Sequence, residues 1–155
     1  MNKSEILAHR LEEIIFESPW YGNNIESSIM KITADQAVQR INNQHNIAEL
    51  LAHMIQWKKF VFQKAFGDQD FDIKVNSEDD WRVINEISQG DWEMMKIEFL
   101  EITGDLIQGL DNFAQSSFAK TVPGRKYTYE HLLYGIADHD IYHQGQIMLL
   151  YKILQ

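Results

Sequence analysis

The sequence has no cysteine, and only two prolines and eight glycines among its 155 residues. Without cysteine, the chain forms no disulfide bond, thiolate metal site or iron–sulfur cluster, and it has no cysteine nucleophile of its own. The sequence therefore gives no indication that the protein needs an oxidising compartment. Proline and glycine are the residues that most often interrupt helices, so their scarcity makes long helices the expected structure.

Positive charge is also scarce: the chain has 14 Lys and Arg against 23 Asp and Glu, which gives a formal net charge of −9. Nucleic-acid binders cluster Lys and Arg to replace phosphate counterions, and no such cluster is present. An acidic surface also disfavours anionic membranes, and no apolar run approaches the ~18 residues of a spanning helix. Residues 1–5 lack the pattern of a signal peptide. We therefore expect a cytoplasmic protein with neither nucleic acid nor membrane as a partner.

Hydrophobic residues make up 45% of the chain and aromatic residues 12%, which is typical of a folded protein rather than a disordered one. The length suits one domain of ordinary size with a substantial core. We therefore predict a single domain over residues 1–155.

Apolar residues recur at helical spacing along much of the chain. The first predicted helix ends at Ser18-Pro19, and two short helical pieces follow within residues 19–44. The second long helix covers residues 46–66. Asn46 and Glu49 have the spacing of a capping box, which marks its start.

Two further long helices follow in the second half of the chain. Ser77 and Asp80 have a cap-like spacing and predict the start of the third, which pauses near Gly90 and continues to Phe113. Thr128 caps the last helix. No alternating strand pattern, repeat or low-complexity tract is present. The sequence thus predicts an all-α four-helix bundle with short extra helices between helices 1 and 2.

His139 and His143 are four residues apart in the last helix, so their side chains project from one face. They share that face with Ile136 and Leu150, which we expect to point to the core. A buried polar group without a partner costs roughly 1–3 kcal/mol. A shared metal ion satisfies both imidazoles. A solvated helix face or ordinary hydrogen bonds are the alternatives for such a pair.

The segment His139-Asp140-Ile141-Tyr142-His143 has the spacing of a zinc metalloprotease motif. Asp140, however, stands where the protease has its glutamate base. Only twelve residues follow His143, and none of them is His, Asp or Glu. This disfavours a protease, and a third ligand must come from another helix, as is usual in bundle cores.

His53 is the best candidate for that third ligand. It lies one turn from Glu49 and Trp57, beside the apolar stripe of the second long helix. We therefore predict a metal site formed by His53, His139 and His143. The positions of the remaining histidines suit a ligand less well; these are His9, His45 and His131.

Several neighbouring residues have open roles. Glu49 has two possible roles: a fourth ligand or a base at the metal site, or a helix cap. Its position favours the cap. Gln146 supports His143 or lines a pocket, or it packs against a neighbouring helix. Asp140 orients a group near the site, or it is a solvated or interhelical carboxylate. Three aromatic residues are pocket candidates or part of the core: Tyr21, Trp57 and Tyr142.

A second possible metal site is an acidic stretch that resembles an EF-hand loop. Asp68, Asp70 and Asp72 alternate, and Asp79 has the twelfth position. The sixth position is Ile73, where the sharp turn needs glycine, and the last ligand is usually glutamate. We interpret this stretch as a solvated acidic loop.

With the three histidines assembled, the sequence resembles the DinB-like (DinB/YfiT-type) metal-binding four-helix bundles. The resemblance runs over most of the chain. It includes Trp20-Tyr21-Gly22 and the segment from His45 to His53, and it is strongest from His139 to Ile147. It implies that His53, His139 and His143 bind one divalent ion, often nickel or zinc, with water completing the shell. It also implies a homodimer.

Some members of that family are thiol transferases, so the resemblance implies a metal-dependent S-transferase that joins a low-molecular-weight thiol, such as bacillithiol or mycothiol, to a small electrophile. Three imidazoles with open coordination positions are typical of catalytic rather than structural sites. The alternatives are a non-enzymatic metal-binding or stress-response protein and a metal-dependent hydrolase. A di-iron bundle is disfavoured, because the paired Glu-x-x-His motifs are absent.

Overall fold

The computed structural model describes all residues from Met1 to Gln155, and every regular element in it is a helix. No helix combines the length and the hydrophobicity that crossing a membrane requires. The all-α prediction and the two short helices between the first two long ones are confirmed. The long helices are α1 (Lys3–Ile15), α4 (Ile47–Phe66), α5 (Gln89–Leu110) and α6 (Tyr129–Ile153); the short ones are α2 (Ile25–Met30), α3 (Ala34–Val38) and the 3₁₀ helix η1 (Gln115–Ser117).

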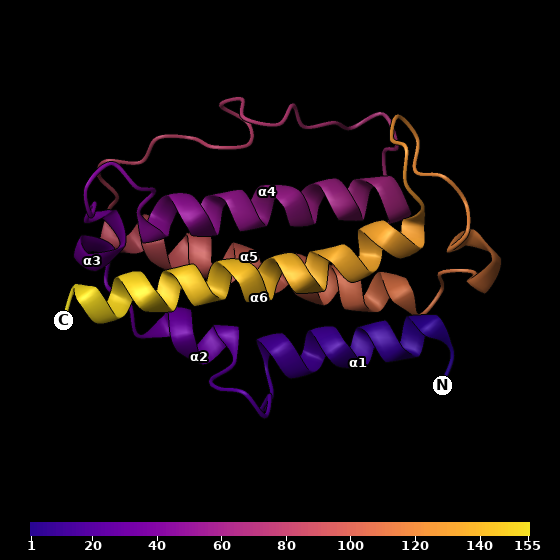
Figure 1. The fold of residues 1–155 in the computed structure, drawn as a ribbon, viewed down its shortest axis with the longest axis horizontal. Coiled ribbons are helices and arrows are strands. Elements are labelled where there is room, and N and C mark those ends of the chain that lie inside the picture. The colour runs from indigo at the N-terminus through magenta and orange to yellow at the C-terminus, as the bar shows by residue number, and fades with distance from the viewer.

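The four long helices form a closed ring around one hydrophobic core (Figure 1). Helix α1 packs against α5 and α6, and α4 packs against the same two helices, so α1 lies opposite α4. Helices α4 and α5 run in the same direction, and α1 and α6 run the opposite way (Figure 1). The interface between α4 and α6 carries the predicted histidines.

Side-chain caps fix most of the helix starts. The capping box of Asn46 and Glu49 opens α4 as predicted, and Thr128 caps α6 by accepting the His131 amide. The first helix ends at Ile15, before the predicted stop at Ser18-Pro19.

The predicted helix start at Ser77 and Asp80 is wrong. Helix α5 begins at Gln89 and ends at Leu110, and the Ser88 side chain caps it. Asp80 makes no cap, because its carboxylate is buried against residues of α4. These long-range contacts replace the local hydrogen bonds of a helix start.

Residues 67–88, which we call the strap, connect α4 to α5 and run back along the length of α4 (Figure 1). Because the strap returns the chain to the start of α4, the two helices it joins are parallel. Near its end, the Ile84 amide donates to Glu49 at 3.0 Å. Near its start, Asp72 pairs with Arg125. These contacts hold the strap over the α4–α6 interface.

Candidate metal centre

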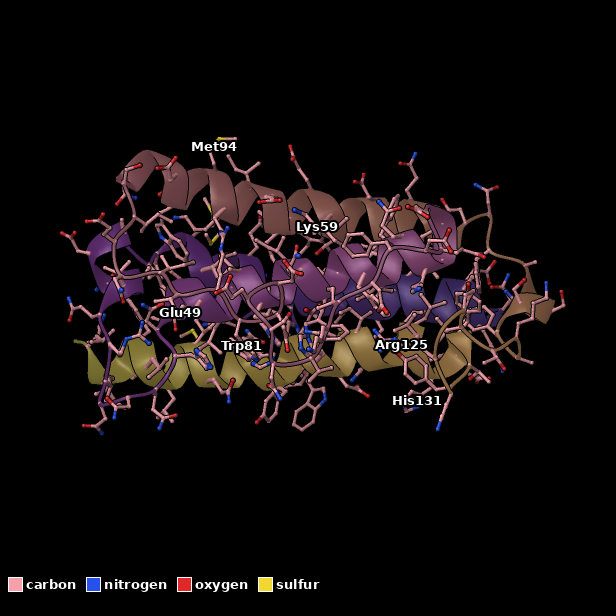
Figure 2. All side chains as sticks on the ribbon, turned by 90° about the horizontal axis from the view of Figure 1, so that it is seen from above. Glu49, Lys59, Trp81, Met94, Arg125 and His131 are labelled. Atoms are coloured by element: carbon pink, nitrogen blue, oxygen red, sulfur yellow. The ribbon has the colours of Figure 1, made fainter.

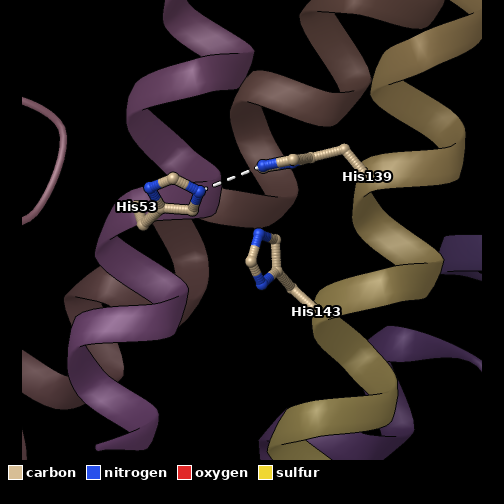
Figure 3. A group of neighbouring side chains, drawn as sticks. All are labelled: His53, His139 and His143. Carbon is tan, nitrogen blue, oxygen red and sulfur yellow. Dashed lines mark hydrogen bonds between the residues drawn. The ribbon is translucent and has the colours of Figure 1, made fainter. Parts of the chain in front are cut away.

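The side chains of His53, His139 and His143 converge between α4 and α6 (Figure 3). One ring nitrogen from each lies within 4.8 Å of the others. Nε2 of His53 and Nε2 of His139 face each other at 3.1 Å. Two nitrogens that each bind one ion at about 2.0–2.1 Å lie about 2.9–3.4 Å apart in octahedral or tetrahedral geometry. This pair is already at the spacing that a shared ion requires.

The far ring nitrogens of two histidines are held by oxygen atoms. His53 Nδ1 lies 2.8 Å from the Asp80 carboxylate and 3.1 Å from the Asp80 carbonyl. His143 Nδ1 donates to the Gln146 side-chain oxygen at 2.6 Å. Both rings therefore present an Nε2 lone pair to the centre of the cluster. In His139, Nδ1 is buried without a hydrogen-bond partner, so Nε2 is its only interacting nitrogen.

The three imidazoles are neutral at neutral pH. Burial is the main cause that lowers each pKa. The pKa of His139 falls to about 3, because burial is reinforced by repulsion from the protonated forms of His143 and His53 and by Lys58. Neutral imidazole is the form that binds a metal ion, so the donor set fits a cation.

A cavity of about 720 Å³ adjoins the three histidines. Trp57 and Tyr142 line it, as predicted for pocket residues, whereas Tyr21 does not. No Lys or Arg lines this cavity, and its polar lining includes three amide side chains, those of Gln44, Asn76 and Gln146.

The strap contributes two residues to the site that the sequence did not indicate. Trp81 stacks between His45 and His53, with ring centroids 3.9 Å and 3.7 Å away and planes 9° from parallel in both pairs. Figure 2 shows Trp81 above the α4–α6 interface. Asp80 is buried directly behind His53. In a metal-binding histidine, the N–H of the second ring nitrogen usually donates to an oxygen acceptor. This general rule is the only signal in the sequence for a carboxylate at this position.

The residues with open roles now have definite positions. Glu49 is a helix cap, and it also accepts hydrogen bonds from Arg40 and His45. Burial raises the pKa of Glu49, but the bonds from Arg40, the Ile84 amide and His45 outweigh burial and lower it to about 2. Glu49 is not part of the histidine cluster. Gln146 supports His143, as one of its two predicted roles required.

Asp140 is an interhelical carboxylate. Its side chain and that of Lys58 are fully buried, and Lys58 Nζ donates to Asp140 Oδ2 at 2.6 Å. The pair joins α6 to α4 one residue from His139.

Two of the remaining candidate histidines and the acidic stretch lie away from the cluster, whereas His45 lines the cavity beside it. His9 and His131 are exposed, in agreement with their weaker prediction. The acidic stretch is exposed as well: Asp68 accepts the Asp70 amide, and Asp72 binds Arg125. No potential metal cluster includes these aspartates.

The geometry agrees with the sequence comparisons. A sequence model of the DinB superfamily matches residues 23–147, which include all three histidines of the cluster. No curated protein matches the chain, and no solved structure does. The matched region covers most of the chain, from the approach to α2 into the last helix. The chain therefore belongs to the DinB superfamily.

Proposed function

We propose that the protein binds one divalent metal ion, nickel or zinc, through His53, His139 and His143. The observation that carries this proposal is the 3.1 Å approach of His53 Nε2 to His139 Nε2 from two different helices. Two unprotonated nitrogens at this distance repel each other unless a proton or a cation lies between them. Imidazole nitrogen suits both nickel and zinc.

We further propose that the site is catalytic. Three protein ligands leave coordination positions for water or a substrate. The adjoining cavity of about 720 Å³ lies within the range of roughly 300–1,000 Å³ that is usual for small-molecule sites. A divalent ion in such a site lowers the pKa of a bound thiol or water.

The reaction class we propose is transfer of a low-molecular-weight thiol to a small electrophile. The thiol proton passes to solvent and sulfur bonds to the electrophilic carbon, while the leaving group departs with the electrons of the broken bond. The chain has no cysteine, so the thiol comes from outside. Trp57 and Tyr142 supply apolar walls, and the amides of Gln44, Asn76 and Gln146 supply hydrogen bonds.

Metal content is the first test. We expect about one equivalent of nickel or zinc in untagged protein, measured by elemental analysis, and its loss in His143→Ala. His131→Ala is the matched control, because His131 is on the same helix but outside the cluster. Equal metal content in the two variants, or none in the wild type after incubation with excess ions, would refute the site.

Thiol consumption is the second test. We expect the metal-loaded protein to consume thiol in the presence of an electrophile, and the chelated protein to lose this activity. Full metal occupancy without thiol consumption identifies a non-enzymatic metal-binding protein instead. The homodimer that the resemblance implies stays a prediction, and sedimentation velocity tests it.

A further inference from the structure

Asp80 is a buried carboxylate that contacts two residues of α4 at the metal site, His53 and Trp57, and one residue of the strap, Asn76. Only 3% of its surface is exposed. Its Oδ1 atom lies 2.8 Å from His53 Nδ1 and accepts the Trp57 indole N–H at 2.8 Å. Its Oδ2 atom accepts the Asn76 amide at 2.7 Å. Three donors thus hold one carboxylate at the back of His53.

The charge of Asp80 has no Lys or Arg partner. Its only ion-pair contact is His53, which burial keeps neutral. A buried carboxylate without a compensating cation is destabilising, because burial removes its hydration. A divalent ion on the far side of the His53 ring supplies positive charge to a site that otherwise holds only neutral imidazoles and this one carboxylate.

The strap also restrains the plane of the His53 ring. Trp81 follows Asp80 in sequence and stacks on that ring at 3.7 Å. Asp80 contacts the ring at its Nδ1 edge, while Trp81 covers its face. The two contacts leave Nε2 directed at His139.

We propose that Asp80 is a positioning residue, which fixes His53 with its proton on Nδ1 and so strengthens metal binding through Nε2. The proposal rests on the metal-binding function proposed above. Carboxylates in this position orient a ligand imidazole and increase its basicity, and their loss typically weakens metal binding 10- to 100-fold.

The test compares Asp80→Ala and Asp80→Asn with Asp79→Asn. Asp79 is the adjacent, exposed carboxylate, so its variant removes the same charge from the same strap. We expect zinc affinity, measured by competition with a chelator, to fall roughly 10- to 100-fold in Asp80→Ala, less in Asp80→Asn, and not at all in the control. Circular dichroism verifies that each variant is folded. If Asp80→Ala does not fold, the nearly isosteric variant Asp80→Asn takes its place in the comparison.

A second readout uses metal-free protein. The Nδ1 proton of His53 should give a strongly downfield NMR resonance, typical of a bond to a carboxylate, that moves upfield in both Asp80 variants. The Asp80 carbonyl, 3.1 Å from Nδ1, is retained in every variant. An unmoved resonance would therefore assign the bond to the carbonyl and overturn the proposal, as would wild-type zinc affinity in a folded Asp80 variant. If wild-type protein binds no metal, the proposed function fails, while the resonance still decides whether Asp80 positions His53.

Discussion

Lys58 and Asp140 form an ion pair in which neither side chain has any exposed surface. Lys58 also lies over the Phe99 ring, with Nζ 4.9 Å from its centroid. Oδ1 of Asp140 has no hydrogen-bond partner. Removing one member of such a pair leaves an uncompensated buried charge, whereas replacing both members with apolar residues is often neutral or stabilising. A single substitution in this pair should therefore destabilise the protein, whereas a double substitution to apolar residues should have little effect or increase stability.

We predict that Lys58→Met lowers the free energy of unfolding by about 3–5 kcal/mol, because it strands the Asp140 carboxylate. The double variant Lys58→Met with Asp140→Leu should recover most of that loss. Urea denaturation of both variants measures the difference. A double variant as unstable as the single one would show that packing, rather than the stranded charge, causes the loss.

At the scale of single elements, the start of α4 differs from the other capped helix starts. Asn46 accepts the Glu49 amide at 2.9 Å, and its side-chain NH₂ donates to the carbonyls of Ile84 at 2.7 Å and Val38 at 3.2 Å. The residue is completely buried. One cap thus joins α4 to the strap and to the end of α3.

We predict that Asn46→Ala destabilises the protein more than Thr128→Ala does. Thr128 is a half-buried cap that makes only its local bond, so its loss should cost about 0.5–2 kcal/mol. Asn46→Ala loses a similar cap and leaves two carbonyls without their donor, which adds roughly 1–3 kcal/mol. Thermal unfolding of both variants is the measurement. Equal losses would mean that water replaces the Asn46 side chain.

At the scale of the whole molecule, acid should destabilise the metal-free protein. The pKa of His139 is about 3 when folded against an ordinary 6.5, so the unfolded chain takes up the proton first. Stability should therefore fall as pH drops below about 6.5, by up to about 1.4 kcal/mol per pH unit for one group. Glu49, with a pKa of about 2 against 4.5, adds a loss of the same sign below about pH 4.5. Urea unfolding between pH 7 and 4 tests this, and equal stability at pH 6.5 and 5 would contradict it.

Metal should stabilise the whole bundle. An ion that binds only the folded state at 100 times its Kd adds about 2.7 kcal/mol, which raises the Tm of a chain of this length by about 5–10 °C. Zinc or nickel should therefore shift the thermal unfolding curve upward, and a chelator should reverse the shift. His143→Ala is expected to show no shift, and an equal shift in that variant would place the ion elsewhere.

The sequence was sufficient to find the bundle and the histidine cluster, because both depend on helical periodicity. His139 and His143 share a helix face by their spacing alone, and His53 follows from its place beside an apolar stripe. The position of Asp80 behind His53 could not be predicted from the sequence, because the strap has no periodicity and its conformation depends on contacts with α4. Asp80 even satisfied a local cap rule, yet its actual partner, His53, lies 27 positions away. The general rule that a ligand histidine has an oxygen acceptor behind it names no residue, and 23 acidic residues offered no means of choosing among them.

The two facing nitrogens of His53 and His139 lie 86 positions apart in the chain. An ion bound between them, as proposed, would tie α4 to α6 across an interface with no covalent link, in a chain that lacks cysteine. Separating these helices would then require the ion to leave first, so the unfolding rate would acquire a barrier set by metal dissociation. The lifetime of the folded protein would therefore depend on the free metal concentration around it. The lifetime of a disulfide-linked protein depends in a similar way on the redox potential of its surroundings, whereas no electron transfer is involved here.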